Sequence, residues 1–402
     1  MNIWFRSTVP LVLCLGISQP LQSAPFEPGK AKDIAIILPA RGDRGVSMDQ
    51  ELFPSPWWND LRAAYAQTSV GTALDVENQR SDWRLVAMRF APCQPLLPYI
   101  SPRNHTLCQP EIRLIWQPVQ QQWRQDRWLA YADDRAIHAL YRVDGEAALG
   151  PQASKVWRGL AQRAGSLSNA EELQYATFNA AVAAEVLSQL KGLRGEGPVA
   201  RYDGVGERPE CADPAQAGKF LLKLRRFLGQ HAKPQLLTQL TTFSLPEGRN
   251  PPLIDEWVFL AFVPGQQGQR LQPQALSVRS RHDGRLLAEY GFAARASVRR
   301  DEEVLQDKLD AAGDGEREEL QDAVIWTFAE RASKGARIAD PEQTHVAHTS
   351  CVSCHKLGDT SFNLHNLSYL EEGGIAVSPR VLKDVARELL WLNAGQPDLA
   401  DQ

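Results

Sequence analysis

Two cysteines and a histidine near the end of the printed sequence are spaced so that they could bind one cofactor together. Cys351, Cys354 and His355 form the pattern Cys-x-x-Cys-His. Two thiols three positions apart can each form a thioether bond to one of the two vinyl groups of a haem, and the adjacent imidazole can then bind the iron axially. The pattern therefore predicts one covalently bound haem c, held by Cys351 and Cys354, with His355 on the iron.

The same residues allow other chemistry, because two further imidazoles precede them. His345 and His348 extend the pattern to His-x-x-His-x-x-Cys-x-x-Cys-His, and four of its five groups could complete a tetrahedral zinc site. A disulfide between Cys351 and Cys354 is the plainest alternative. A thioredoxin-like redox pair is disfavoured, because no βαβ pattern surrounds the two thiols.

The haem-attachment pattern resembles that of the c-type cytochromes. The resemblance covers the pattern and roughly the last 100 residues, a domain-sized segment. A helix is expected before the pattern, from about Leu320 to Phe328, and another after it, from Ser378 to about Gly395. The expected buried stripe of the last helix is Leu382, Val385, Leu389 and Leu392. The order helix, haem-binding loop, terminal helix is similar to a small cytochrome c domain and implies that fold here.

The second axial ligand decides what such a haem can do. Single-haem electron carriers of this family place a Met well downstream of the pattern, but no Met follows His355. His365 and His345 each lie ten residues from His355, and ten extended residues reach ~33 Å, so either can pass around a haem edge. We expect His365 as the distal ligand and His345 as the alternative, and a vacant or water-bound iron stays open. The candidates to pair with the haem propionates are Lys334, Arg337, Lys356 and Arg380.

The first residues have the plan of a secretory signal. Arg6 is the only charged residue before Glu27, residues 9–17 are mostly apolar, and a small residue stands at Ser23. This layout predicts a signal peptide at 1–23 and export to the periplasm. No run approaches the ~18 apolar residues of a membrane-spanning helix, so we expect no integral membrane span after cleavage.

Export makes the other cysteines informative, because thiols in an oxidising compartment tend to be paired or ligated. Cys93 and Cys108 flank a segment rich in proline, which is typical of a loop. We expect a disulfide between them, which would stabilise the fold by ~3 kcal/mol in the chain-entropy model. Cys211 is either a buried thiol or a replacement for one partner of that pair.

The residues before 296 are expected to form an α+β region with an antiparallel sheet. Alternation with a period of two predicts half-buried strands at 84–90, 111–117 and 136–143. Val86, Met88 and Phe90 should share one face of the first strand, whereas His138 should face away from the apolar side of the third. Ser168 and Glu171 predict a capping box that opens a helix, and Asp283-Gly284 predicts a hairpin. The expected divisions are 1–23, an α+β domain of unknown role at 24–295, and a mainly α-helical, haem-binding cytochrome c-like domain at 296–402.

The charge balance of the chain limits the kinds of partner that it is expected to bind. The 402 residues include 44 Lys and Arg against 48 Asp and Glu, a net charge of −4, which argues against nucleic acid as a partner. The first hypothesis is a periplasmic protein that transfers electrons through its haem to an unidentified redox partner protein. The second is a haem enzyme or small-ligand sensor with an open distal site, and the third is an exported zinc-binding module. Whether the chain is an enzyme stays open.

Overall fold

A computed structural model of the chain describes a large antiparallel sheet with helices on both of its faces. The described residues are 29–39, 45–66, 80–95, 108–124, 127–132, 136–163, 166–195, 204–244, 256–265, 268–274, 276–282, 285–291, 293–297, 306–309, 336–337, 339–341, 343, 368–370 and 374–393.

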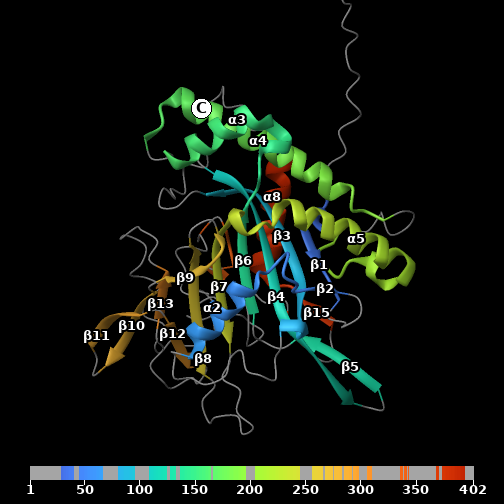
Figure 1. Ribbon diagram of the computed structural model, residues 1–402, viewed down its shortest axis with the longest axis vertical. Coiled ribbons are helices and arrows are strands. Elements are labelled where there is room, and N and C mark those ends of the chain that lie inside the picture. The colour runs from blue at the N-terminus through green and yellow to red at the C-terminus, as the bar shows by residue number, and fades with distance from the viewer. Residues whose placement is uncertain are drawn as a thin grey trace, which may run out of the picture.

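Ten strands within the described residues form the large sheet (Figure 1). Its main path runs β1–β3–β4–β6–β7–β8–β12, with β2 paired to β3, β5 to β4 and β9 to β8. The bounds are β1 (Ala35–Ile37), β2 (Val46–Ser47), β3 (Trp83–Pro95), β4 (Cys108–Arg124), β5 (Arg127–Ala132), β6 (Ala136–Arg142), β7 (Leu237–Ser244), β8 (Glu256–Pro264), β9 (Leu271–Gln274) and β12 (Ala293–Ser297). Every strand pairing is antiparallel, as the alternating sequence pattern predicts.

Two smaller sheets contain the remaining described strands. One has the order β11–β10–β13, and the other pairs β14 with β15. Their bounds are β10 (Leu276–His282), β11 (Arg285–Gly291), β13 (Gln306–Leu309), β14 (Ser368–Leu370) and β15 (Gly374–Ala376). His282 pairs with Arg285, which leaves two positions between the strands and confirms the hairpin predicted from the sequence.

Helices cover one face of the sheet and bury the main core. They are α2 (Ser55–Ala66), α3 (Glu146–Gln162), α4 (Asn169–Lys191) and α5 (Pro214–His231). Ser168 and Glu171 form the expected capping box at the start of α4, with the Ser168 backbone N–H donating to the Glu171 carboxylate over 2.9 Å. The apolar sides of these helices meet sheet residues such as Met88, Leu114 and Ala139, all at most 1% exposed.

A β-bulge in β3 moves one predicted core residue to the opposite face of the sheet. Leu85 pairs with Trp116 and Ala87 pairs with Ile115, so Val86 is an extra residue in the ladder. Val86 is fully buried, but it packs against Ile115 and Val119 rather than into the main core. The prediction that Val86 shares a face with Met88 and Phe90 is therefore wrong, because the bulge breaks the period-two alternation.

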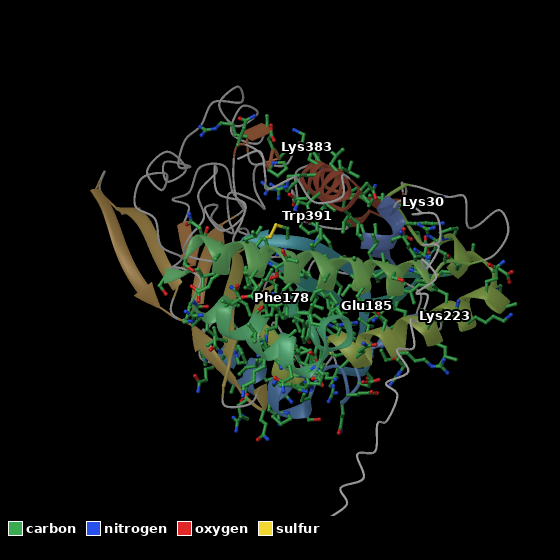
Figure 2. The ribbon with its side chains drawn as sticks, turned by 90° about the horizontal axis from the view of Figure 1, so that it is seen from above. Lys30, Phe178, Glu185, Lys223, Lys383 and Trp391 are labelled. Atoms are coloured by element: carbon green, nitrogen blue, oxygen red, sulfur yellow. A yellow bond between two sulfur atoms is a disulfide. The ribbon has the colours of Figure 1, made fainter. Side chains whose placement is uncertain are left out.

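The terminal helix α8 (Pro379–Asn393) packs on this same sheet, on the face opposite α4. Figure 2 shows α8, marked by Lys383 and Trp391, across the sheet from α4, marked by Phe178 and Glu185. Val385 of α8 is 1% exposed and belongs to the main core cluster.

Both ends of the described chain meet at α8. The Gly29 backbone N–H donates to the side chain of Asn393 over 2.9 Å, across 364 positions. The fold predicted for the C-terminal region, a small and mainly α-helical cytochrome c-like domain, is therefore wrong. The last helix completes the α+β unit. The described strands that begin in that region are β13, β14 and β15, and the end of β12 reaches into it.

A disulfide joins the first two long strands. Cys93 near the end of β3 and Cys108 at the start of β4 are bonded, as expected from the sequence, and Cys211 is buried outside this pair. Among the described helices, none is both long enough and apolar enough to cross a membrane.

Candidate functional site

The residues predicted to attach the haem or to bind a metal ion lie outside the described part of the chain, as do Lys334 and Lys356. The former are His345, His348, Cys351, Cys354, His355 and His365. The structure does describe the segments that flank them and the surface with which those segments make contact. That surface is the face of the sheet that α8 covers, called here the α8 face.

The segment before the haem-attachment pattern contacts the middle of α8. Arg387 donates a hydrogen bond from its Nη1 to the backbone carbonyl of Pro341 over 3.3 Å. Ala339 is 7% exposed, so this segment is partly packed against the protein. Pro341 precedes Cys351 by ten residues.

The segment after the pattern leads into the start of α8. The hairpin of β14 and β15 lies beside β5 and is followed by Ser378, which is 4% exposed. The Ser378 hydroxyl accepts a hydrogen bond from the Arg380 backbone N–H over 3.1 Å, as an N-cap residue does. Both flanks of the pattern are thus fixed on or beside the α8 face.

A cluster of charged side chains joins α8 to the sheet. Arg89 of β3 donates to Asp384 over 3.0 Å and to Glu388 over 2.5 Å. Arg380 lies 3.1 Å from the same Asp384 carboxylate. These side chains are at most 15% exposed, so each ion pair is largely shielded from water.

Burial and neighbouring charges oppose each other in setting the pKa values of these carboxyl groups. Burial raises the pKa of Asp384, but Arg89, Arg380 and Arg387 outweigh it and bring the pKa down to about 2. Burial dominates at Glu388 and raises its pKa, despite the bond from Arg89. Asp384 is therefore the anionic centre of the cluster.

A second arginine on the sheet is more loosely paired. Arg113 of β4 lies 3.7 Å from Glu111, and its side chain is 21% exposed. Burial lowers the pKa of Arg113 and raises that of Glu111. A small polar cleft adjoins this pair, with about 400 Å³ of empty space when the open solvent at its mouth is included. It is lined by residues that include Arg89, Glu111, Arg113, Arg380, Asp384 and Arg387.

An apolar hollow of about 550 Å³, counted with its open mouth, adjoins the polar cleft. Cross-strand pairing places Ile37, Ala87, Ile115 and His138 in one row along the α8 face. Val381 of α8 lines the same hollow, as do Ser378 and Arg113. The hollow therefore has apolar walls, an imidazole on its sheet side and a guanidinium at its border with the polar cleft.

The histidine that is buried in the main core lies on the opposite face of the sheet. His231 of α5 is 1% exposed and its Nε2 lies 2.8 Å from the side-chain oxygen of Gln189. Among the described residues no group of three or more His, Cys, Asp and Glu side chains could hold a metal ion. His138, which is half-buried, lies instead on the side of the sheet to which the flanks of the pattern are fixed.

Several features of this face were missed by sequence reasoning. Arg380 was expected as a propionate partner, but it is 2% exposed and paired with Asp384. Leu382 was expected to be buried, but it is 45% exposed. The spacing of four between Arg380, Asp384 and Glu388 places them on one side of a helix and was the available signal.

Comparison with known proteins gives no family for this chain: no family model, no curated protein and no solved structure matches it.

Proposed function

We propose that this chain is an exported protein that carries one covalent haem c and transfers electrons through it. The observation that carries the proposal is the Cys-x-x-Cys-His spacing at Cys351, Cys354 and His355. The two thiols would form the thioether bonds and the imidazole would be an axial ligand. When bound, the haem supplies a one-electron redox centre.

The residue types of the pattern suit this group. Two thiols and an adjacent imidazole are the residues that haem c attachment needs. The flanks of the pattern are fixed by Arg387 at Pro341 and by the capped start of α8 at Ser378. The disulfide between Cys93 and Cys108 supports a location where thiols are oxidised, such as the periplasm.

The test is expression of the full chain in a bacterium with a working cytochrome c maturation system. We expect an intact mass increased by one haem, and haem colour that persists on a denaturing gel. Replacing both Cys351 and Cys354 with Ser should abolish the covalent haem. The matched control is Cys211→Ser, which removes a buried thiol elsewhere and should leave the haem in place.

The electron-transfer part of the proposal has its own readout. We expect a low-spin spectrum that changes reversibly on oxidation and reduction and does not respond to carbon monoxide. A haem that binds carbon monoxide readily would instead indicate an open site. A colourless chain of unmodified mass would overturn the proposal, and one bound zinc ion per chain in its place would favour the zinc alternative.

A further inference from the structure

The side chains in and beside the polar cleft on the α8 face carry more positive than negative charge. Four arginines stand against three carboxyl groups within the described residues, so one positive charge is in excess even when every carboxyl group is ionised. The residues are Arg89, Arg113, Arg380 and Arg387, with Glu111, Asp384 and Glu388. A guanidinium group does not lose its proton in a protein, so an anion or solvent must balance the excess charge.

Two of the arginines face each other across neighbouring strands. Arg89 of β3 and Arg113 of β4 are partners in the sheet register, so their side chains leave the same face. Like charges at such positions repel each other. Arg89 is compensated, because it donates to Asp384 over 3.0 Å and to Glu388 over 2.5 Å. Arg113 is compensated less well: its Nη2 lies 3.7 Å from Glu111, farther than a hydrogen bond, although its side chain is only 21% exposed.

A second loosely held guanidinium lines the same cleft from the helix. Arg387 of α8 has its Nη2 3.9 Å from Asp384, and its Nη1 donates to the Pro341 carbonyl over 3.3 Å. Hydrogen bonds from a guanidinium to a carboxylate are usually about 2.7–2.9 Å long. Arg113 and Arg387 therefore bring weakly used N–H donors to one cleft, one from the sheet and one from α8.

The size of the cleft limits what it can hold. It leaves about 20 Å³ for the centre of a water-sized particle. A single water molecule needs about 10–15 Å³ by the same measure. One small ion or one carboxylate group therefore fits, and a larger molecule does not.

We propose that the cleft binds one small monovalent anion with the chemistry of a carboxylate, such as formate, between Arg113 and Arg387. The anion neutralises the excess charge and joins β4 to α8 through charge-assisted hydrogen bonds. The flat pair of carboxylate oxygens matches the fork of a guanidinium. This inference is independent of the proposed haem, because the residues that carry it lie in the described part of the chain.

The test is thermal unfolding of the full-length protein in chloride-free mixtures of sodium formate and sodium gluconate at one total concentration. Gluconate has the same charge but is too bulky for the cleft, so it keeps the ionic strength constant. We expect the Tm of wild type to rise with the formate concentration and then to level off, because a ligand that binds the folded state stabilises it. An equal Tm in every mixture would mean that the cleft holds only water, which would overturn the proposal.

Variants of Arg113 locate the site. Arg113→Gln should weaken formate binding about tenfold or more, because it removes a charge-assisted hydrogen bond. Arg113→Lys keeps the charge but loses the fork, so its affinity should lie between those of wild type and Arg113→Gln. The matched control is Arg270→Gln, since Arg270 pairs with Asp60 and its side chain is 69% exposed. Its response to formate should equal that of wild type.

The side of the cleft formed by α8 has its own variant. Arg387→Gln should also weaken formate binding, and a wild-type response would remove α8 from the site. A wild-type response in Arg113→Gln would overturn the site as a whole. If Arg113→Gln does not fold, an unchanged response in both Arg113→Lys and Arg387→Gln overturns it instead. A protein without haem would overturn only the proposed function, because the response to formate is measured in the same way with or without it.

Discussion

His231 shows how burial in the main core changes the titration of a side chain. It closes the last turn of α5, is 1% exposed and contacts Gln189. Burial lowers its pKa from 6.5 to about 4. The folded protein therefore holds this imidazole neutral at pH values where the unfolded chain would protonate it.

This difference predicts a pH-dependent loss of stability. The pKa of His231 is lower in the folded state, so its contribution is fully present above pH 6.5 and falls as the pH drops towards about 4. The loss should reach ~3 kcal/mol once the pH is below both values. Urea unfolding of wild type and His231→Gln between pH 7 and pH 4 checks this. If the free energy of unfolding depended on pH equally in the two proteins, the prediction would be contradicted.

Among the contacts between elements, Gly268 provides a close contact between α2 and the segment that leads into β9. Gly268 precedes β9 with a φ of 69°, and its carbonyl accepts a 2.8 Å hydrogen bond from the indole of Trp57 in α2. A Cβ at this position would lie 2.2 Å from the Pro234 carbonyl oxygen. Both the backbone conformation and the close approach require glycine.

We expect Gly268→Ala to destabilise the protein by about 2 kcal/mol or more. The matched control is Gly218→Ala in α5, where a Cβ meets nothing within 4 Å. That change should be neutral or stabilising by up to ~1 kcal/mol, because alanine favours a helix. Thermal unfolding of the two variants side by side measures the difference, and similar Tm values would refute the requirement for glycine.

Local patterns predicted those elements whose signals are contained in a few neighbouring residues. The capping box at Ser168 and the hairpin after His282 are examples, because turn and cap chemistry acts over three or four positions. The bulge at Val86 is not visible in this way, since it depends on register against β4. The charged face of α8 was missed for a similar reason: its partner Arg89 lies 295 positions from Asp384.

The residues of the candidate site also fall into two groups, those that a local pattern predicts and those that depend on contacts between distant segments. A covalent haem can be predicted from Cys351, Cys354 and His355 alone, because that pattern is contiguous, and it stays a prediction. The hollow at His138 is built by strand pairing and by α8, and a sequence gives no sign of which distant segments meet. The alternation did predict that His138 faces away from the main core, and the structure confirms this.

For the molecule as a whole, α8 packs into the same core as the sheet, so we expect the helix and the sheet to unfold together. Val385 packs in the main core and is 1% exposed, whereas Leu390 on the same helix is 71% exposed. If α8 were part of a separate domain, a substitution on its buried side would leave the free energy of unfolding of the sheet unchanged.

We expect Val385→Asp to destabilise the entire unit by about 4 kcal/mol, because it buries a charge in an apolar site. Leu390→Asp should change stability by no more than ~0.5 kcal/mol. Tryptophan fluorescence during denaturant unfolding, recorded in a Trp391→Phe background because Trp391 lies in α8, follows the sheet through residues such as Trp83 and Trp116. Loss of α8 structure in Val385→Asp with an unshifted tryptophan transition would contradict the shared unit.

The hydrogen bond between Gly29 and Asn393 joins residues that are 364 positions apart. Residues 379–393 also supply the carboxylate partners of Arg89 on β3, 295 positions earlier in the chain. The α8 face of the sheet is therefore covered only after residues 379–393 have docked, so a folding intermediate that lacks this contact leaves Arg89 without its carboxylate partners.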